Sequence, residues 1–143
     1  MAIQKSDRAV ARSILNDDKV VAQFAENCDR LFAGKTARVS AKSAATVQKF
    51  LNQQLCGHFA YEERHILPEL LRAGRGAEVA RTVAEIQQDH RALIQEIHEL
   101  TRLLAAENSG GPERQALRVA MAAFRKHLQQ HSALENTLYP SLV

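Results

Sequence analysis

The sequence contains no tryptophan, and it has only three prolines and six glycines among 143 residues. Because these residues are the strongest helix breakers, their scarcity leaves room for long helices. The N-terminal residues 1–15 lack the apolar core of a signal peptide, and no stretch approaches the roughly 18 apolar residues that span a membrane. We therefore expect a cytoplasmic protein without membrane contact.

Cysteines are also few, and neither positive nor negative charge strongly predominates. Cys28 and Cys56 lie far apart and match no metal-binding or redox spacing, so we expect reduced, partly buried thiols. The formal net charge is only +3, and the basic residues are scattered among acidic ones. This distribution lacks the concentrated positive surface of a nucleic-acid-binding protein, so no nucleic-acid partner is expected.

The residues that are present favour a single helical domain. Hydrophobic residues make up 45% of the chain and charged residues 24%, and Ala, Leu, Gln, Glu and Arg, which dominate, favour helices. Glycine-containing joints separate four predicted helices, at 7–33, 40–72, 77–107 and 112–138. Four helices with short joints predict one all-α domain over residues 1–143, an up-down-up-down four-helix bundle.

Local signals bear on several of these boundaries. Ser40 is a suitable N-cap for the second helix, and Pro112 suits the first turn of the fourth. In the third helix, apolar residues recur at steps of three and four, which is the period of an amphipathic helix. Pro68 lies inside the second helix and should kink it or end it near Leu67, because proline lacks the N–H donor and clashes with the preceding turn.

Two segments of the chain share one motif, in which a histidine is followed four residues later by a glutamate. His58 and Glu62 form it in the second predicted helix, and His131 and Glu135 form it in the fourth. Residues four apart lie one above the other on a helix, so each motif presents an imidazole beside a carboxylate. Each motif is followed by an apolar segment with a proline, ILPEL and LYPSL.

The two motifs and His90 of the third helix are expected at a common height in the bundle. Counted from the helix ends at about 1.5 Å per residue, their positions agree to within about one helical turn. Unpaired charges buried in such a layer would cost several kcal/mol each, and a bound cation would remove that cost. The predicted metal ligands are therefore His58, Glu62, His90, His131 and Glu135.

Several neighbouring polar residues allow more than one interpretation. The segment NDDKVVAQ resembles QDHRALIQ, which sets Asp18 opposite His90 as a further carboxylate ligand; the alternative is an acidic residue favoured near a helix start. His127, one turn before His131, could add a ligand, support one or pack in the core. Glu63 is expected to face solvent, because adjacent helical residues point about 100° apart. Tyr61 is expected to pack rather than bind metal.

These motifs resemble the hemerythrin-like family, the HHE cation-binding domains, over nearly the whole chain. That family is a four-helix bundle with a non-haem di-iron centre. It takes one histidine from the first helix, His-x-x-x-Glu from the second, a histidine from the third and His-x-x-x-Glu, or a His and an Asp, from the fourth. The resemblance implies iron ligands at His58, Glu62, His90, His131 and Glu135, and the surrounding HFAYEE, DHRAL and ENTLYP are also typical.

Two positions depart from the family pattern. The first predicted helix contains no histidine, and Asp18 stands where the resemblance places one. Oxygen carriers of the family have a second histidine four residues after the one on the third helix, where this chain has Ile94. The resemblance therefore implies a centre of one or two iron ions with fewer terminal ligands than an oxygen carrier has.

The predicted function is a non-haem iron-binding protein that senses or handles iron, dioxygen or nitric oxide. Imidazole and carboxylate ligands suit iron, and zinc or manganese are the alternative metals. The alternative function is a metal-free helical interaction module that keeps the fold without the centre, and a homodimer is compatible with either function. No acid–base pair or nucleophile stands apart from the predicted ligands, so an enzyme is the less expected class.

Overall fold

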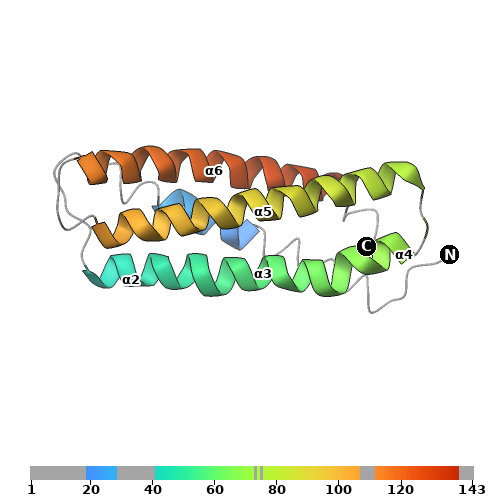
Figure 1. Ribbon diagram of the computed structural model, residues 1–143, viewed down its shortest axis with the longest axis horizontal. Helices are drawn as coiled ribbons and strands as arrows, with labels where there is room; N and C mark the ends of the chain where they lie inside the picture. The colour runs from blue at the N-terminus through green and yellow to red at the C-terminus, as the bar shows by residue number, and fades with distance from the viewer. Residues whose placement is uncertain (1–18, 29–40, 73, 75, 107–111, 139–143) are drawn as a thin grey trace.

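A computed structural model of the chain describes residues 19–28, 41–72, 74, 76–106 and 112–138. Helices and one short turn account for these residues, and no strand occurs among them. The long helices lie along a common axis, and from residue 41 onward each runs in the direction opposite to the one before it (Figure 1). The predicted all-α helical bundle is confirmed.

The second predicted helix is one continuous rod, which we call helix 41–72. Its segments are α2 (Ala41–Lys49), η1 (Phe50–Leu55), α3 (Cys56–Tyr61), η2 (Glu62–Ile66) and α4 (Leu67–Arg72). The segments η1 and η2 are π-helical turns, which are wider than an α-helical turn because each N–H bonds to the carbonyl five residues earlier. Such turns are rare overall, but where they occur they often lie at functional sites. Here η2 begins at Glu62.

Pro68 is accommodated inside this rod without ending it. It occupies the second position of α4, and the helix continues to Arg72, so the predicted end near Leu67 is wrong. A proline ring clashes with the carbonyl four residues earlier, which is that of Arg64 in η2. The wide turn directly before α4 relieves that clash, and the ribbon changes direction there (Figure 1). The alternative expectation, a kink, fits the structure.

The two remaining long helices match their predicted ranges closely. They are α5 (Ala77–Ala106) and α6 (Pro112–Leu138), which lie side by side in Figure 1. Gly74 and Gly76 precede α5 with φ angles of 60° and 106°, a conformation that favours glycine and lets the chain reverse. Of the first predicted helix, the structure describes the helical residues 19–28; Asp18 lies outside the described residues.

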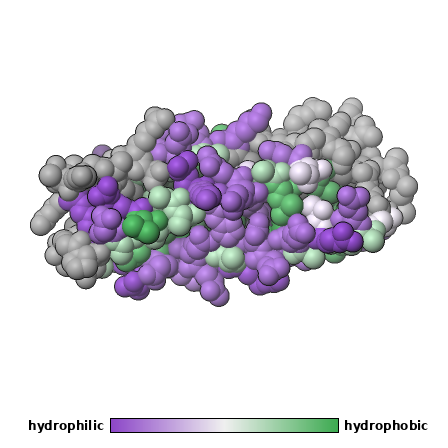
Figure 2. All heavy atoms as spheres, turned by 90° about the horizontal axis from the view of Figure 1, so that it is seen from above, coloured by the Kyte–Doolittle hydropathy of each residue, from purple (hydrophilic) through white to green (hydrophobic). Residues whose placement is uncertain are grey.

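The exterior of the bundle is mostly polar. The face seen from above is largely hydrophilic, with separate hydrophobic areas (Figure 2). Among the described residues, the large exposed apolar side chains are Val20, Tyr61, Leu71 and Val119. Tyr61 and Leu71 lie on helix 41–72, and the other two lie on separate helices. None of the helices that the structure describes is long and apolar enough to span a membrane. The apolar faces are therefore turned mainly toward the other helices of the bundle.

The core consists of two apolar clusters with a polar layer between them. The larger cluster reaches Phe59 on helix 41–72, and the smaller one begins at Ile66 on the same helix. On α5 the smaller cluster ends at Ile86 and the larger begins at Leu93. Four buried polar residues lie at the boundary between the two clusters. They are Glu62, His90, His131 and Glu135. The common height expected from residue counting is therefore present in the fold.

Candidate metal centre

Four polar side chains from three helices converge in this layer. Glu62 comes from η2, His90 from α5, and His131 and Glu135 from α6. Each offers one ligand atom, and these atoms all lie within 4.8 Å of one another. Metal bonds of about 2.0–2.2 Å, as imidazole and carboxylate form to zinc, place opposite donors about 4 Å apart. The four atoms lie near this spacing and would need to move together only slightly to surround a single ion.

Water has almost no access to these side chains. The exposed fractions of Glu62, His90, His131 and Glu135 are 0%, 2%, 1% and 0%. Polar groups so deeply buried are tolerated only when hydrogen bonds, ion pairs or a metal satisfy them. Their burial between two apolar clusters distinguishes them from histidines and acids on a solvated helix face.

His58 lies beside this group rather than within it. Its Nε2 is 2.6 Å from Glu62 Oε1, and its side chain is 8% exposed. It is not one of the four residues whose ligand atoms lie mutually within 4.8 Å. The structure thus brings together four of the predicted ligands, places His58 against one of them, and does not describe Asp18.

The outer nitrogens of the two central imidazoles contact carboxylates. His90 Nδ1 lies 2.8 Å from Glu63 Oε1, and His131 Nδ1 lies 3.3 Å from Asp89 Oδ2. An ionised carboxylate can only accept a hydrogen bond, so Nδ1 carries the proton and donates it in both pairs. This tautomer leaves the lone pair on Nε2, and a carboxylate on the far nitrogen is the usual arrangement around a metal-bound histidine.

Both Nε2 atoms face the interior of the site. His90 Nε2 is 3.9 Å from Glu62 Oε2 and 3.8 Å from Glu135 Oε1, while His131 Nε2 is 2.7 Å from Glu135 Oε1. Within the described part of the chain, neither Nε2 has a hydrogen-bond partner of suitable geometry. A buried polar atom without a partner costs about 1–3 kcal/mol. A cation coordinated by both nitrogens would remove this cost.

The electrostatic environment favours an ionised Glu62 and a neutral His131. Burial acts to raise the pKa of the Glu62 carboxyl, but hydrogen bonding with His58 and Glu135 and the charges of His58 and His90 outweigh it, so the pKa falls to about 2. Burial, reinforced by the neighbouring His90, lowers the pKa of His131 despite the nearby carboxylates. An ionised Glu62 and a neutral His131 are both competent metal ligands.

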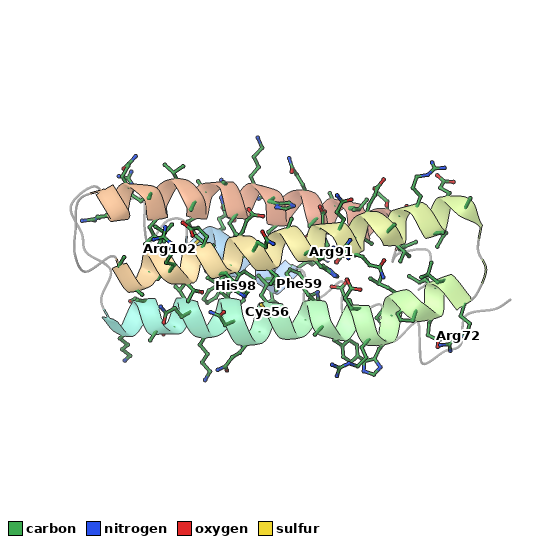
Figure 3. All side chains as sticks on the ribbon, viewed as in Figure 1. Cys56, Phe59, Arg72, Arg91, His98 and Arg102 are labelled. Atoms are coloured by element: carbon green, nitrogen blue, oxygen red, sulfur yellow. The ribbon has the colours of Figure 1, made fainter. Side chains whose placement is uncertain are left out.

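Phe59 forms the wall between the site and the larger apolar cluster. Its ring stacks on His90 with centroids 4.6 Å apart, and it meets His131 edge-on at 5.6 Å. Only 1% of the residue is exposed, and it lies between helix 41–72 and α5 in Figure 3. Because the Phe59 ring contacts both imidazoles, it limits their rotation and excludes water from this side of the site.

Replacing Phe59 with alanine should lower the free energy of unfolding by about 3–5 kcal/mol, because the change removes a fully buried ring and leaves a cavity. Urea denaturation followed by circular dichroism measures the difference. Tyr61→Ala is the matched control: this aromatic residue lies two positions away and is 44% exposed, so its loss should change stability by no more than about 0.5 kcal/mol. Equal losses in the two variants would contradict the packing role given to Phe59.

Some outcomes differ from the expectations for the neighbouring residues. Glu63 keeps 35% of its side-chain exposure but contacts His90, so the expectation that it simply faces solvent is wrong. The wide turn η2 is the physical reason, because more residues per turn bring Glu63 round toward the face of Glu62.

Tyr61 is exposed instead of packed, with its ring centroid 4.8 Å from that of His65. Asp89 was not predicted at all, although its position next to His90 was a usable signal.

His127 supports the site from outside. Its Nε2 lies 3.4 Å from Asp89 Oδ1, and its Nδ1 contacts a carboxylate oxygen of Glu96. It is not among the four mutually close ligand residues, so the structure favours the supporting role over that of an added ligand. Burial opposes the charged form of its imidazole, but hydrogen bonds to Glu96 and Asp89 outweigh burial, so the pKa of His127 lies above its ordinary value of 6.5.

This raised pKa predicts how His127 contributes to stability as pH changes. The contribution should be fully present below pH 6.5 and lost as pH rises through the raised pKa, because the folded state then releases the proton. His127→Asn should therefore destabilise the metal-free protein at pH 6 by about 1 kcal/mol and much less at pH 9. Thermal melts in a chelator at both pH values test this, with His98→Asn on the exposed face of α5 as control. A deficit that grows with pH would contradict it.

Comparison with known proteins agrees with the geometry of the site. A family model described as the hemerythrin HHE cation-binding domain matches residues 17–143. No curated protein and no solved structure matches the chain. The matched range contains every described helix and all four residues of the buried polar layer. The chain thus belongs to the hemerythrin HHE cation-binding domain family.

Proposed function

We propose that the protein binds non-haem iron in the layer formed by Glu62, His90, His131 and Glu135, and that it senses or handles iron, dioxygen or nitric oxide. The supporting observation is the convergence of four ligand atoms within 4.8 Å of one another, from four residues of which none is more than 2% exposed. Two imidazoles and two carboxylates form a ligand set that suits iron. Zinc and manganese are the alternative metals for the same ligands.

One or two ions are compatible with this arrangement. The four mutually close atoms define one position, and Glu62 also contacts His58 at 2.6 Å. Carboxylates from different helices bridge paired ions in other four-helix bundles, so Glu62 is suited to connect a second position on the side of His58. We assign His58 to that second position, with Asp18 as a further carboxylate ligand from the first helix.

The residues around the ligands orient the imidazoles and keep the adjoining space apolar. Iron bound here would supply redox chemistry and coordination positions for a small ligand. Glu63 and Asp89 hold the outer nitrogens of His90 and His131, so that both inner nitrogens keep their lone pairs for the metal. Phe59 keeps the adjoining space apolar. The cytoplasmic location expected from the sequence is part of this proposal.

Metal analysis and a visible spectrum of protein purified in air test the proposal. We expect near-stoichiometric iron, one or two ions per chain, together with visible absorption by ferric iron. Protein that stays free of metal, even after anaerobic loading with ferrous iron, would reject the proposal and support the metal-free interaction module. Zinc or manganese in place of iron would keep the metal centre and reject the iron assignment.

A further inference from the structure

A line of alternating carboxylates and imidazoles runs from the metal centre toward the surface, and we call it the support chain. It begins at His131, whose Nδ1 is 3.3 Å from Asp89 Oδ2, and continues from Asp89 Oδ1 to His127 Nε2 at 3.4 Å. It ends where His127 Nδ1 contacts Glu96. The residues alternate between α6 and α5, so the chain also joins the two helices.

Exposure increases sharply after the first residue of the support chain. The His131 side chain is 1% exposed, whereas those of Asp89, His127 and Glu96 are 31%, 24% and 33% exposed. Their partial contact with water lowers the cost of keeping these three groups charged. The buried imidazole of His131 is therefore held through its outer nitrogen by groups that are themselves partly solvated.

The partners of each ring dictate where the protons lie. Both nitrogens of His127 face carboxylate oxygens, which only accept, so the protonated ring donates to both Asp89 and Glu96. Asp89, held by His127, accepts a hydrogen bond from the Nδ1–H of His131. The Nε2 atom of His131 is then the nitrogen without a proton. The support chain thus selects both the tautomer and the orientation of this imidazole.

The second central imidazole is supported differently. His90 Nδ1 contacts Glu63 at 2.8 Å, and Glu63 lies one residue after Glu62 on the same helix. Among the contacts described for this part of the chain, no second histidine stands behind Glu63 as His127 stands behind Asp89. The centre therefore has one histidine held by a single carboxylate and one held by a chain of three residues.

We propose that Asp89, His127 and Glu96 are positioning residues that hold His131 Nε2 toward the bound ion and so set the affinity of the metal site. The inference rests on the proposed function. Asp89 acts directly on His131, and His127 and Glu96 act through Asp89. The effect of His127 on metal binding must therefore depend on the presence of Asp89.

Cobalt(II) binding to four forms of the full chain tests this dependence: wild type, Asp89→Ala, His127→Ala and the double variant. Asp89→Ala should weaken cobalt binding about 10–100-fold, as is usual for the loss of such a carboxylate. His127→Ala should weaken binding in the wild-type background and have no further effect in the Asp89→Ala background. Asp89→Asn, which keeps an oxygen acceptor, should restore part of the affinity. Glu99→Gln on α5, which removes the negative charge from a surface ion pair with Arg102, is the control and should bind cobalt normally.

The visible ligand-field bands of bound cobalt provide a readout that general loss of stability would not change. These bands should shift in Asp89→Ala and Asp89→Asn, because the orientation and basicity of one imidazole ligand change. Affinity within twofold of wild type in Asp89→Ala, or equal effects of His127→Ala in both backgrounds, would overturn the support chain and leave the proposed function intact. Wild-type protein that binds neither cobalt nor iron would overturn both.

Discussion

Replacing His131 and Glu135 together with alanine is expected to abolish metal uptake, from near-stoichiometric iron to none detectable. The change removes two of the four mutually close ligand atoms and all of those that come from α6. Of the four mutually close ligands only Glu62 and His90 would remain, and two are fewer than the three or four that hold a metal ion in typical protein sites. The second position at His58 also depends on this ion, because Glu62 is the ligand that would connect the two. Metal analysis after loading with ferrous iron and desalting measures the loss.

The chain offers a closely matched control for this variant. His65 and Glu69 have the same residue types at the same four-residue spacing on helix 41–72, but both are exposed. Replacing both with alanine should leave iron content unchanged and should cost little stability, since the Glu69–Arg72 ion pair lies on the surface. Glu135→Gln keeps the size of the buried side chain, so a loss of iron in this variant could not be attributed to unfolding. Full iron content in His131→Ala/Glu135→Ala would reject the site.

Removal of the metal is expected to produce the second large effect, a marked loss of thermal stability. A ligand that binds only the folded state stabilises it by about 4 kcal/mol when its free concentration is about 1,000 times its dissociation constant. In a domain near the size of this 143-residue chain, each kcal/mol shifts the melting temperature by about 2–4 °C. A strong chelator should therefore lower the melting temperature of iron-loaded protein by about 8–16 °C.

The physical cause of this shift lies in the polar layer. Two apolar clusters enclose Glu62, His90, His131 and Glu135, so that, without an ion, inner nitrogens such as His90 Nε2 stay unsatisfied. Melting curves of His131→Ala/Glu135→Ala should be the same with and without the chelator, because this variant has no metal to lose. A wild-type melting temperature that is insensitive to both iron and the chelator would contradict the account.

The fold was largely predictable because its signals are local. Apolar residues at steps of three and four predict the third helix, and glycine-containing joints separate all four predicted helices. The ends of α5 and α6 accordingly agree with the predicted 77–107 and 112–138 to within one residue. Pro68 was harder to interpret, because sequence shows that a normal turn must fail there but not that a wide turn will replace it.

The candidate site was predictable to the extent that height alone determines it. The rise per helical residue is constant, so counting from short joints places His90 level with the two His–Glu motifs. The contacts of Glu63 and His127 depend instead on the rotation of each helix about its own axis and on the facing helix. A π-helical turn alters that rotation, and residue counting does not reveal it.

Anomalous X-ray scattering at the iron absorption edge, measured on crystals of iron-loaded protein, is the most direct test that the buried polar layer is a cation site. The account predicts a peak enclosed by Glu62, His90, His131 and Glu135, with ligand atoms at about 2.0–2.2 Å if the bonds resemble those to zinc. A peak elsewhere on the molecule, with these four side chains bonded only to one another, would contradict it.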